Sequence, residues 1–132
     1  VVFGQSDGGA ARDGNYTAMP PEGEWVRASP GSIAAAVNWV AKRRVKSGAP
    51  STTAPAMTLI LALKPQAVYL LTDGEFDNPD LLTLKDTIER GDPEHAVQIN
   101  TIALTGPQGD EAYDLKALAE QHNGTYRRVV VP

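Results

Sequence analysis

The chain of 132 residues has the length of one domain with a single hydrophobic core, and its 42% hydrophobic content is that of an ordinary globular protein. The 12 basic and 16 acidic residues give a net charge of -4 with no broad basic stripe, so we expect no nucleic-acid partner. The absence of cysteine excludes disulfides and thiolate metal sites and leaves the cellular compartment undetermined, and no apolar run approaches the ~20 residues that span a bilayer.

The first half of the chain predicts two short strands and two helices. In order, we expect a strand at 1–5, a Gly-rich irregular stretch at 6–23, a short edge strand at 24–28, a helix at 30–46 and, after a loop at 47–50, a helix at 53–63. Ser29 and Pro30 give the first helix an N-cap and a first-turn proline, and Ile33, Val37 and Val40 lie on one face. Apolar residues surround the second helix, which predicts burial on most sides.

The second half alternates strands and helices. We expect a strand at 66–72, a helix at 78–91, a strand at 96–104, a helix at 110–124 with Asp110 as its N-cap, and a last strand at 125–131. The run Ala67 to Leu71 is apolar without interruption, as in a parallel strand covered on both faces. Such alternation implies right-handed βαβ crossovers. We therefore expect residues 1–132 to form one α/β domain with a Rossmann-like, doubly wound, mostly parallel sheet and helices on both faces.

The stretch YLLTDGEFDNPD, residues 69–80, places Asp73 at the carboxyl end of a strand. Open α/β sheets bind ligands beyond this end of their strands. The hydroxyl-rich loop at 47–53 is expected at the same edge, and a carboxylate with hydroxyl oxygens suits Mg²⁺, Mn²⁺ or Ca²⁺. Glu75 and Asp77 follow in the Asp73 loop and add negative field that attracts a cation.

Three segments, AVYLLTDGEFD, SGAPSTTAPAMTLILAL and VQINTIAL with LKALAEQHNGTYRRV, resemble the von Willebrand factor type A domain, particularly its bacterial members. The resemblance covers the chain from about residue 24 onward. It implies a metal-ion-dependent adhesion site at which a divalent cation bridges to an acidic group of a protein partner, in a domain that is not an enzyme. Asp73 matches the third motif of the family, and Ser51, with Thr52 as the alternative, matches the threonine of the second. Either hydroxyl would equally serve as a helix N-cap.

The first motif of that family, Asp-x-Ser-x-Ser after the opening strand, is absent, because residues 5–9 read Gln-Ser-Asp-Gly-Gly. We interpret residues 1–5 as the second strand of the family and expect the first strand to lie upstream. Its loss would leave strand edges unpaired, so we expect aggregation or oligomerisation by strand complementation. With Asp73 and one hydroxyl as ligands, roughly four positions of an octahedral ion are left to water, so we expect weak binding of Mg²⁺ at best.

Two other functions are open. Gly4-Gln5-Ser6-Asp7-Gly8 fits the Gly-x-Ser-x-Gly elbow of an α/β-hydrolase, with Asp73 and either His95 or His122 following in the required order, but the Gly- and Pro-rich sequence after it forbids the helix that should follow. The chain would alternatively be a structural interaction domain that binds partners without metal. The two histidines are far apart in the sequence, which makes a zinc site improbable.

Overall fold

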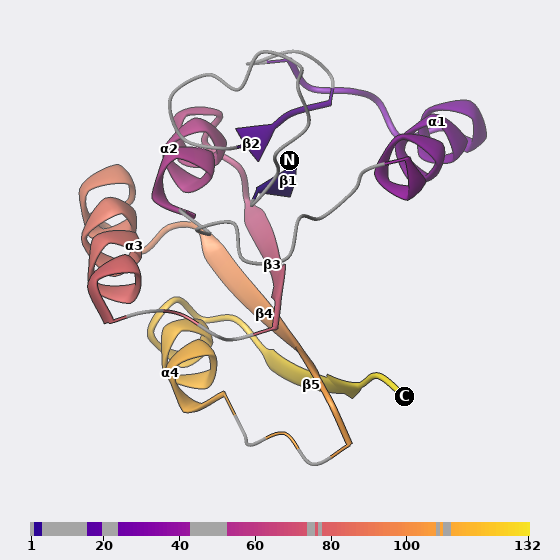
Figure 1. Ribbon diagram of the computed structural model, residues 1–132. Coiled ribbons are helices and arrows are strands. Elements are labelled where there is room, and N and C mark those ends of the chain that lie inside the picture. The colour runs from indigo at the N-terminus through magenta and orange to yellow at the C-terminus, as the bar shows by residue number, and fades with distance from the viewer. Residues whose placement is uncertain are drawn as a thin grey trace. The chain divides into compact units, whose positions relative to one another are not determined.

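Figure 1 shows the computed structural model of the chain, which has five strands and four helices among the residues it describes. The described residues are 2–3, 16–19, 24–42, 53–73, 76, 78–107, 109 and 112–132. They fall into two compact units, residues 1–63 and 64–132. The expected single domain over 1–132 stays a prediction. No helix within the described ranges is long and apolar enough to cross a membrane.

The first unit begins with a small antiparallel pair of strands. β1 (Val2–Phe3) pairs with β2 (Tyr16–Thr17). This confirms part of the strand expected at 1–5. The irregular stretch expected at 6–23 is wrong at β2, where an aromatic and a β-branched residue suit the pleated backbone.

The two helices of the first unit are α1 (Pro30–Ala41) and α2 (Ala54–Ala62). The edge strand expected at 24–28 is wrong, because residues 24–28 form neither a strand nor a helix. The hydroxyl of Ser32 donates to the carbonyl of Arg27 at 2.8 Å, and Ser29 and Ser32 cap each other's backbone N–H groups. The aliphatic side chains of α1 are exposed and Trp39 is half-buried, whereas α2 buries Ala56, Met57 and Leu61.

The second unit is built on a parallel sheet of three strands in the order β3 (Ala67–Thr72), β4 (Gln98–Thr105) and β5 (Tyr126–Val130). Two helices, α3 (Asn78–Gly91) and α4 (Tyr113–Gln121), connect them. The strands expected at 66–72, 96–104 and 125–131 and their parallel pairing are therefore confirmed. The residue before α4 is Ala112, and the expected cap Asp110 lies outside the described residues.

The core of this unit lies between one face of the sheet and the two helices. Strand order follows chain order, so two successive right-handed crossovers place α3 and α4 on the same face (Figure 1). Among the largest fully buried side chains are Leu84 and Ile88 of α3, Leu115 and Leu118 of α4, and Ile99 of β4.

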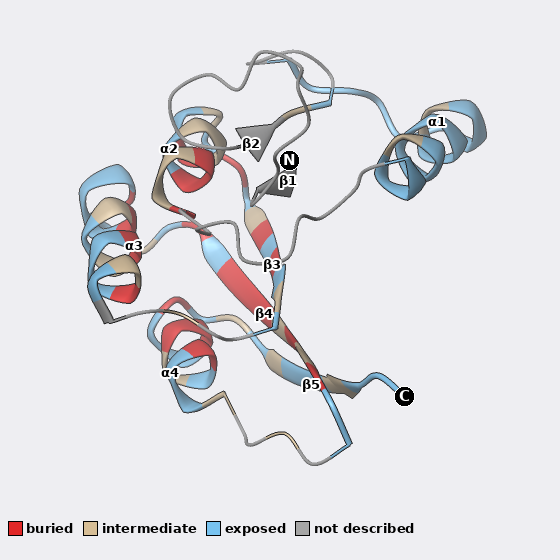
Figure 2. Cartoon of the chain, viewed as in Figure 1, coloured by how far each residue is buried: buried red, intermediate tan, exposed pale blue. Residues whose placement is uncertain are grey.

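The other face of β3 is covered by neither α3 nor α4. Tyr69 and Leu71 of β3 are 71% and 52% exposed, while Val68 and Leu70 between them are buried (Figure 2). The expectation that both faces of this strand are covered is thus wrong for the second unit. Cover on the second face would require a reversal of strand order, and the described strands have none.

The parallel arrangement gives the sheet two distinct edges. We call the end where β3, β4 and β5 begin the amino edge, and the end where they finish the carboxyl edge. The chain leaves the carboxyl edge into each helix and returns through α3 and α4 to the amino edge. The turn after α4 packs directly on β4, because a Cβ atom added to Gly124 would lie 1.8 Å from the carbonyl oxygen of Ile99.

Candidate functional site

Asp73 lies at the carboxyl edge, directly after β3, with an exposed side chain. The hydroxyl of Thr72 donates to its carboxylate at 3.3 Å. The expected position of this carboxylate at a strand tip is therefore confirmed. Ser51, Thr52, Glu75 and Asp77 lie outside the described residues, so the convergence of their oxygens with Asp73 stays a prediction.

The hydrolase alternative needs an aspartate beside a histidine, and the structure separates the two. Asp73 follows the last residue of β3, whereas His95 and His122 precede the first residues of β4 and β5. The length of β3, about 3.3 Å per residue, lies between these edges. Asp73 therefore orients neither imidazole, and Ser6 lies outside the described residues.

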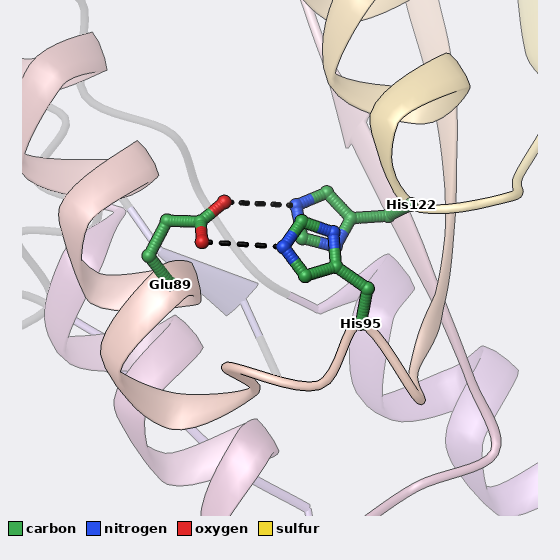
Figure 3. A group of neighbouring side chains, drawn as sticks. All are labelled: Glu89, His95 and His122. Atoms are coloured by element: carbon green, nitrogen blue, oxygen red, sulfur yellow. Dashed lines mark hydrogen bonds and ion pairs between the residues drawn. The ribbon is translucent and has the colours of Figure 1, made fainter.

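The amino edge instead brings together Glu89, His95 and His122 (Figure 3). Glu89 is on the last turns of α3, His95 is in the loop before β4, and His122 caps the end of α4. The carboxylate of Glu89 lies 3.2 Å from Nε2 of His95 and 3.9 Å from Nε2 of His122. The two imidazoles are stacked, with centroids 4.5 Å apart and planes 8° from parallel. One carboxylate thus faces two histidines side by side.

A buried aspartate shapes the loop that carries His95. The carboxylate of Asp92 accepts hydrogen bonds from the N–H groups of Ala96 at 3.0 Å and Val97 at 2.8 Å, and its carbonyl accepts from the N–H of His95. His95 itself has a φ of 51°, in the left-handed region that non-glycine residues rarely adopt. The loop therefore fixes the backbone of His95 at a cost in strain.

The proton on the His95 ring is fixed by its neighbour on α4. Nδ1 of His95 lies 3.2 Å from the carbonyl oxygen of Gln121. A carbonyl only accepts, so Nδ1 carries a hydrogen and Nε2 is the atom turned toward Glu89. The bond to Gln121, and then the negative charge of Glu89, raise the pKa of His95 above its ordinary value of 6.5.

His122 is held more rigidly than His95. Its backbone N–H donates to Ala119, its carbonyl accepts from the N–H of Ile99 at the start of β4, and its side chain is only 1% exposed. Burial, followed by the charge of the neighbouring His95, lowers the pKa of His122 below 6.5. Its Nδ1 atom is buried and has no hydrogen-bond partner among the described residues. His122 is therefore a neutral imidazole near neutral pH.

The sequence interpretation missed this cluster. Distance along the chain suggested that the two histidines lie apart, and the structure overturns that inference because both rings stack at one edge. The available signal was their place in the βαβ pattern, since each histidine comes shortly before a predicted parallel strand. Residues in equivalent places before neighbouring parallel strands meet at the same edge of the sheet.

Comparison of the chain with models of protein families, with curated proteins and with solved structures finds no match. Any inference about function therefore depends on the residues and their geometry.

Proposed function

We propose that this chain is a non-enzymatic, protein-binding domain of the von Willebrand factor type A kind that recognises its partner through a divalent cation. Asp73 holds Mg²⁺, Mn²⁺ or Ca²⁺ at the carboxyl edge, Ser51 or Thr52 is the hydroxyl ligand that the family resemblance implies, and an acidic side chain of the partner completes the coordination. The observation that carries the proposal is the exposed carboxylate of Asp73 at the carboxyl end of a parallel strand.

The chemistry of the edge suits a hard cation. Asp73 offers carboxylate oxygens, and Thr72 next to it places a hydroxyl 3.3 Å from one of them. Oxygen donors alone favour Mg²⁺, Mn²⁺ and Ca²⁺ over softer ions. With few protein ligands, most of the coordination is left to water and to the carboxylate of the partner. We therefore expect an ion that binds weakly by itself and more tightly within a complex.

The sheet supports a second kind of contact. Among the described strands β3 pairs only with β4, so one side of β3 has no strand beside it. Such a side presents backbone N–H and C=O groups to any extended segment. Addition of a strand there would let the domain oligomerise by strand complementation, with Asp73 at the tip of the same strand.

The test is a Mn²⁺ titration followed by electron paramagnetic resonance of the free ion. We expect a dissociation constant on the order of 10⁻⁴–10⁻³ M, in the range of weak oxygen sites. Asp73→Asn should abolish this binding without loss of stability, because the side chain is exposed.

Asp86→Asn is the matched control, since Asp86 is an exposed carboxylate on α3 that pairs with Arg90 at 2.6 Å. It should leave Mn²⁺ binding unchanged. Absence of Mn²⁺ binding, or binding that survives Asp73→Asn, would contradict the proposal and favour an interaction domain that works without metal.

A further inference from the structure

The geometry points to a second metal site, distinct from the proposed carboxyl-edge site: we propose that Glu89, His95 and His122 bind a transition-metal ion of the zinc class at the amino edge of the sheet. This site uses other residues, other donor atoms and another class of ion than Asp73 does. It does not depend on the proposed function.

The three side chains already gather their donor atoms. One ligand atom from each of Glu89, His95 and His122 lies within 4.8 Å of the others. Tetrahedral Zn²⁺ with bonds of about 2.1 Å requires ligand atoms about 3.4 Å apart, so atoms at the 4.8 Å limit must come closer by about 1.4 Å. The two stacked rings are 8° from parallel, so one ring must tilt before both Nε2 lone pairs point at the same ion. The side chains of Glu89 and His95, which are 53% and 37% exposed, have room to move, while His122 is fixed by burial. The ion would thus bind against His122, and the other two ligands would close on it.

The hydrogen-bond pattern requires a positive charge between His95 and Glu89. Because Nδ1 of His95 donates to the carbonyl of Gln121, the lone pair of a neutral ring lies on Nε2. That lone pair faces a carboxylate oxygen at 3.2 Å, so two hydrogen-bond acceptors would face each other with no hydrogen between them. Either a proton or a metal ion must lie between them. Metal-bound histidines commonly direct their other N–H group to a backbone carbonyl in this way.

His122 supplies the second nitrogen in the form that a metal requires. Its ring is almost fully buried, and its Nδ1 has no hydrogen-bond partner among the described residues. Its Nε2 faces the second oxygen of the same carboxylate at 3.9 Å, too long for a hydrogen bond. A bound ion would replace this loose contact with coordinate bonds.

The donor set decides the class of ion. Two imidazoles and one carboxylate suit Zn²⁺ and related borderline ions, whereas Mg²⁺ and Ca²⁺ prefer oxygen alone. Three protein ligands leave the fourth position of a tetrahedron for water or an external ligand. Because Glu89 and His95 are partly exposed, this position is open to solvent.

The test is a titration of the full chain, freed of metal with a chelator, with Zn²⁺ and with Co²⁺ at about pH 7.5, because protons compete with the metal for the ligands at lower pH. Competition with a chromophoric chelator measures the Zn²⁺ affinity, and intense visible absorption of Co²⁺ reports tetrahedral coordination. We expect one equivalent of metal, bound with a dissociation constant in the micromolar range or tighter. Glu89→Gln and His95→Asn should each weaken binding by about tenfold or more.

The controls separate this site from its surroundings. Glu94→Gln makes the same change of charge in the loop that carries His95 and should leave Zn²⁺ affinity unchanged. Asp73→Asn should also leave it unchanged, while Glu89→Gln should leave Mn²⁺ binding unchanged, so failure at one edge is distinguished from failure at the other. Circular dichroism confirms that each variant is folded.

Three results would overturn the proposal. They are the absence of Zn²⁺ binding, binding that survives both Glu89→Gln and His95→Asn in folded protein, and equal weakening by Glu94→Gln. The first would show that a proton alone joins His95 to Glu89, and the other two would show that the metal binds elsewhere or responds only to the net charge of the region.

Discussion

The two edges of the sheet in the second unit are built differently. At the carboxyl edge Asp73 is exposed at a strand tip, and Arg128 of β5 donates to Thr105 and to the Gly109 carbonyl in the loop after β4. At the amino edge a buried aspartate, two stacked imidazoles and a glutamate tie the ends of α3 and α4 to the start of β4. Topology draws attention to the first edge because ligands of open sheets gather there. The amino edge shows that functional groups also gather where the ends of helices lead back into the strands of a sheet.

The prediction with the largest expected effect tests whether the amino edge is more tightly packed than the carboxyl edge. Gly124→Ala should destabilise the protein by about 3 kcal/mol or more, because the added methyl group would overlap the backbone of Ile99. Gly106→Ala is the control at the carboxyl edge, where an added Cβ meets no atom within 4 Å. Thermal melting of both variants checks the difference. Similar melting temperatures would mean that the two edges are equally tolerant.

The prediction with the next largest effect tests whether Asp92 stabilises the loop that carries His95. Asp92→Ala should cost about 2 kcal/mol, because the buried N–H of Val97 and that of Ala96 lose their acceptor. Urea denaturation measures this loss. Asp86→Ala, which removes only an exposed ion pair with Arg90, should cost about 0.5 kcal/mol or less. The prediction fails if the two variants are equally stable.

The smallest effect concerns pH, measured with a chelator present. The pKa of His95 is raised in the folded protein by Gln121 and Glu89, so its contribution to stability is fully present below pH 6.5 and is lost as pH rises through the raised value. The gap in melting temperature between the wild type and His95→Asn should therefore shrink from about pH 6 to about pH 8.

The contribution of His122 to stability depends on pH in the opposite direction. Its pKa is lowered, so its contribution is present above pH 6.5 and is lost as pH falls through the lowered value. It is neutral in the folded protein over most of the chosen window, which leaves His95 as the group that titrates. The charged groups that face His95 are the carboxylates of Glu89 and Asp92. A gap that is constant with pH would show that His95 holds no extra proton in the fold.

Much of the second unit follows from local signals. The apolar runs and helix caps of residues 64–132 predict its strands and helices, and the position of Asp73 after a strand follows from the same pattern. Coverage of the sheet does not follow. The apolar run Ala67 to Leu71 looks buried on both sides, but which face a helix covers depends on strand order, and Tyr69 and Leu71 are exposed.

The cluster at the amino edge could not be predicted from patterns within one segment of the sequence, for a different reason. The hydrogen bonds of Asp92 position the loop that carries His95. The carbonyl of Gln121 positions the ring, and this contact joins the loop before β4 to the end of α4. No pattern within a single segment encodes such a contact. The order of parallel strands had to be known before the two histidines could be placed together.

β4 is the strand with a neighbour on each side among those described, and it carries Ile99 and Ala103 fully buried. Fraying of the sheet therefore starts at β3 or β5 and reaches β4 last, so its amide hydrogens should be the slowest to exchange with solvent. Because the carbonyl of His122 is bonded to the N–H of Ile99, the buried imidazole is anchored to this slowest-opening strand. Asp73 follows an outer strand of the described sheet, where we expect opening to start.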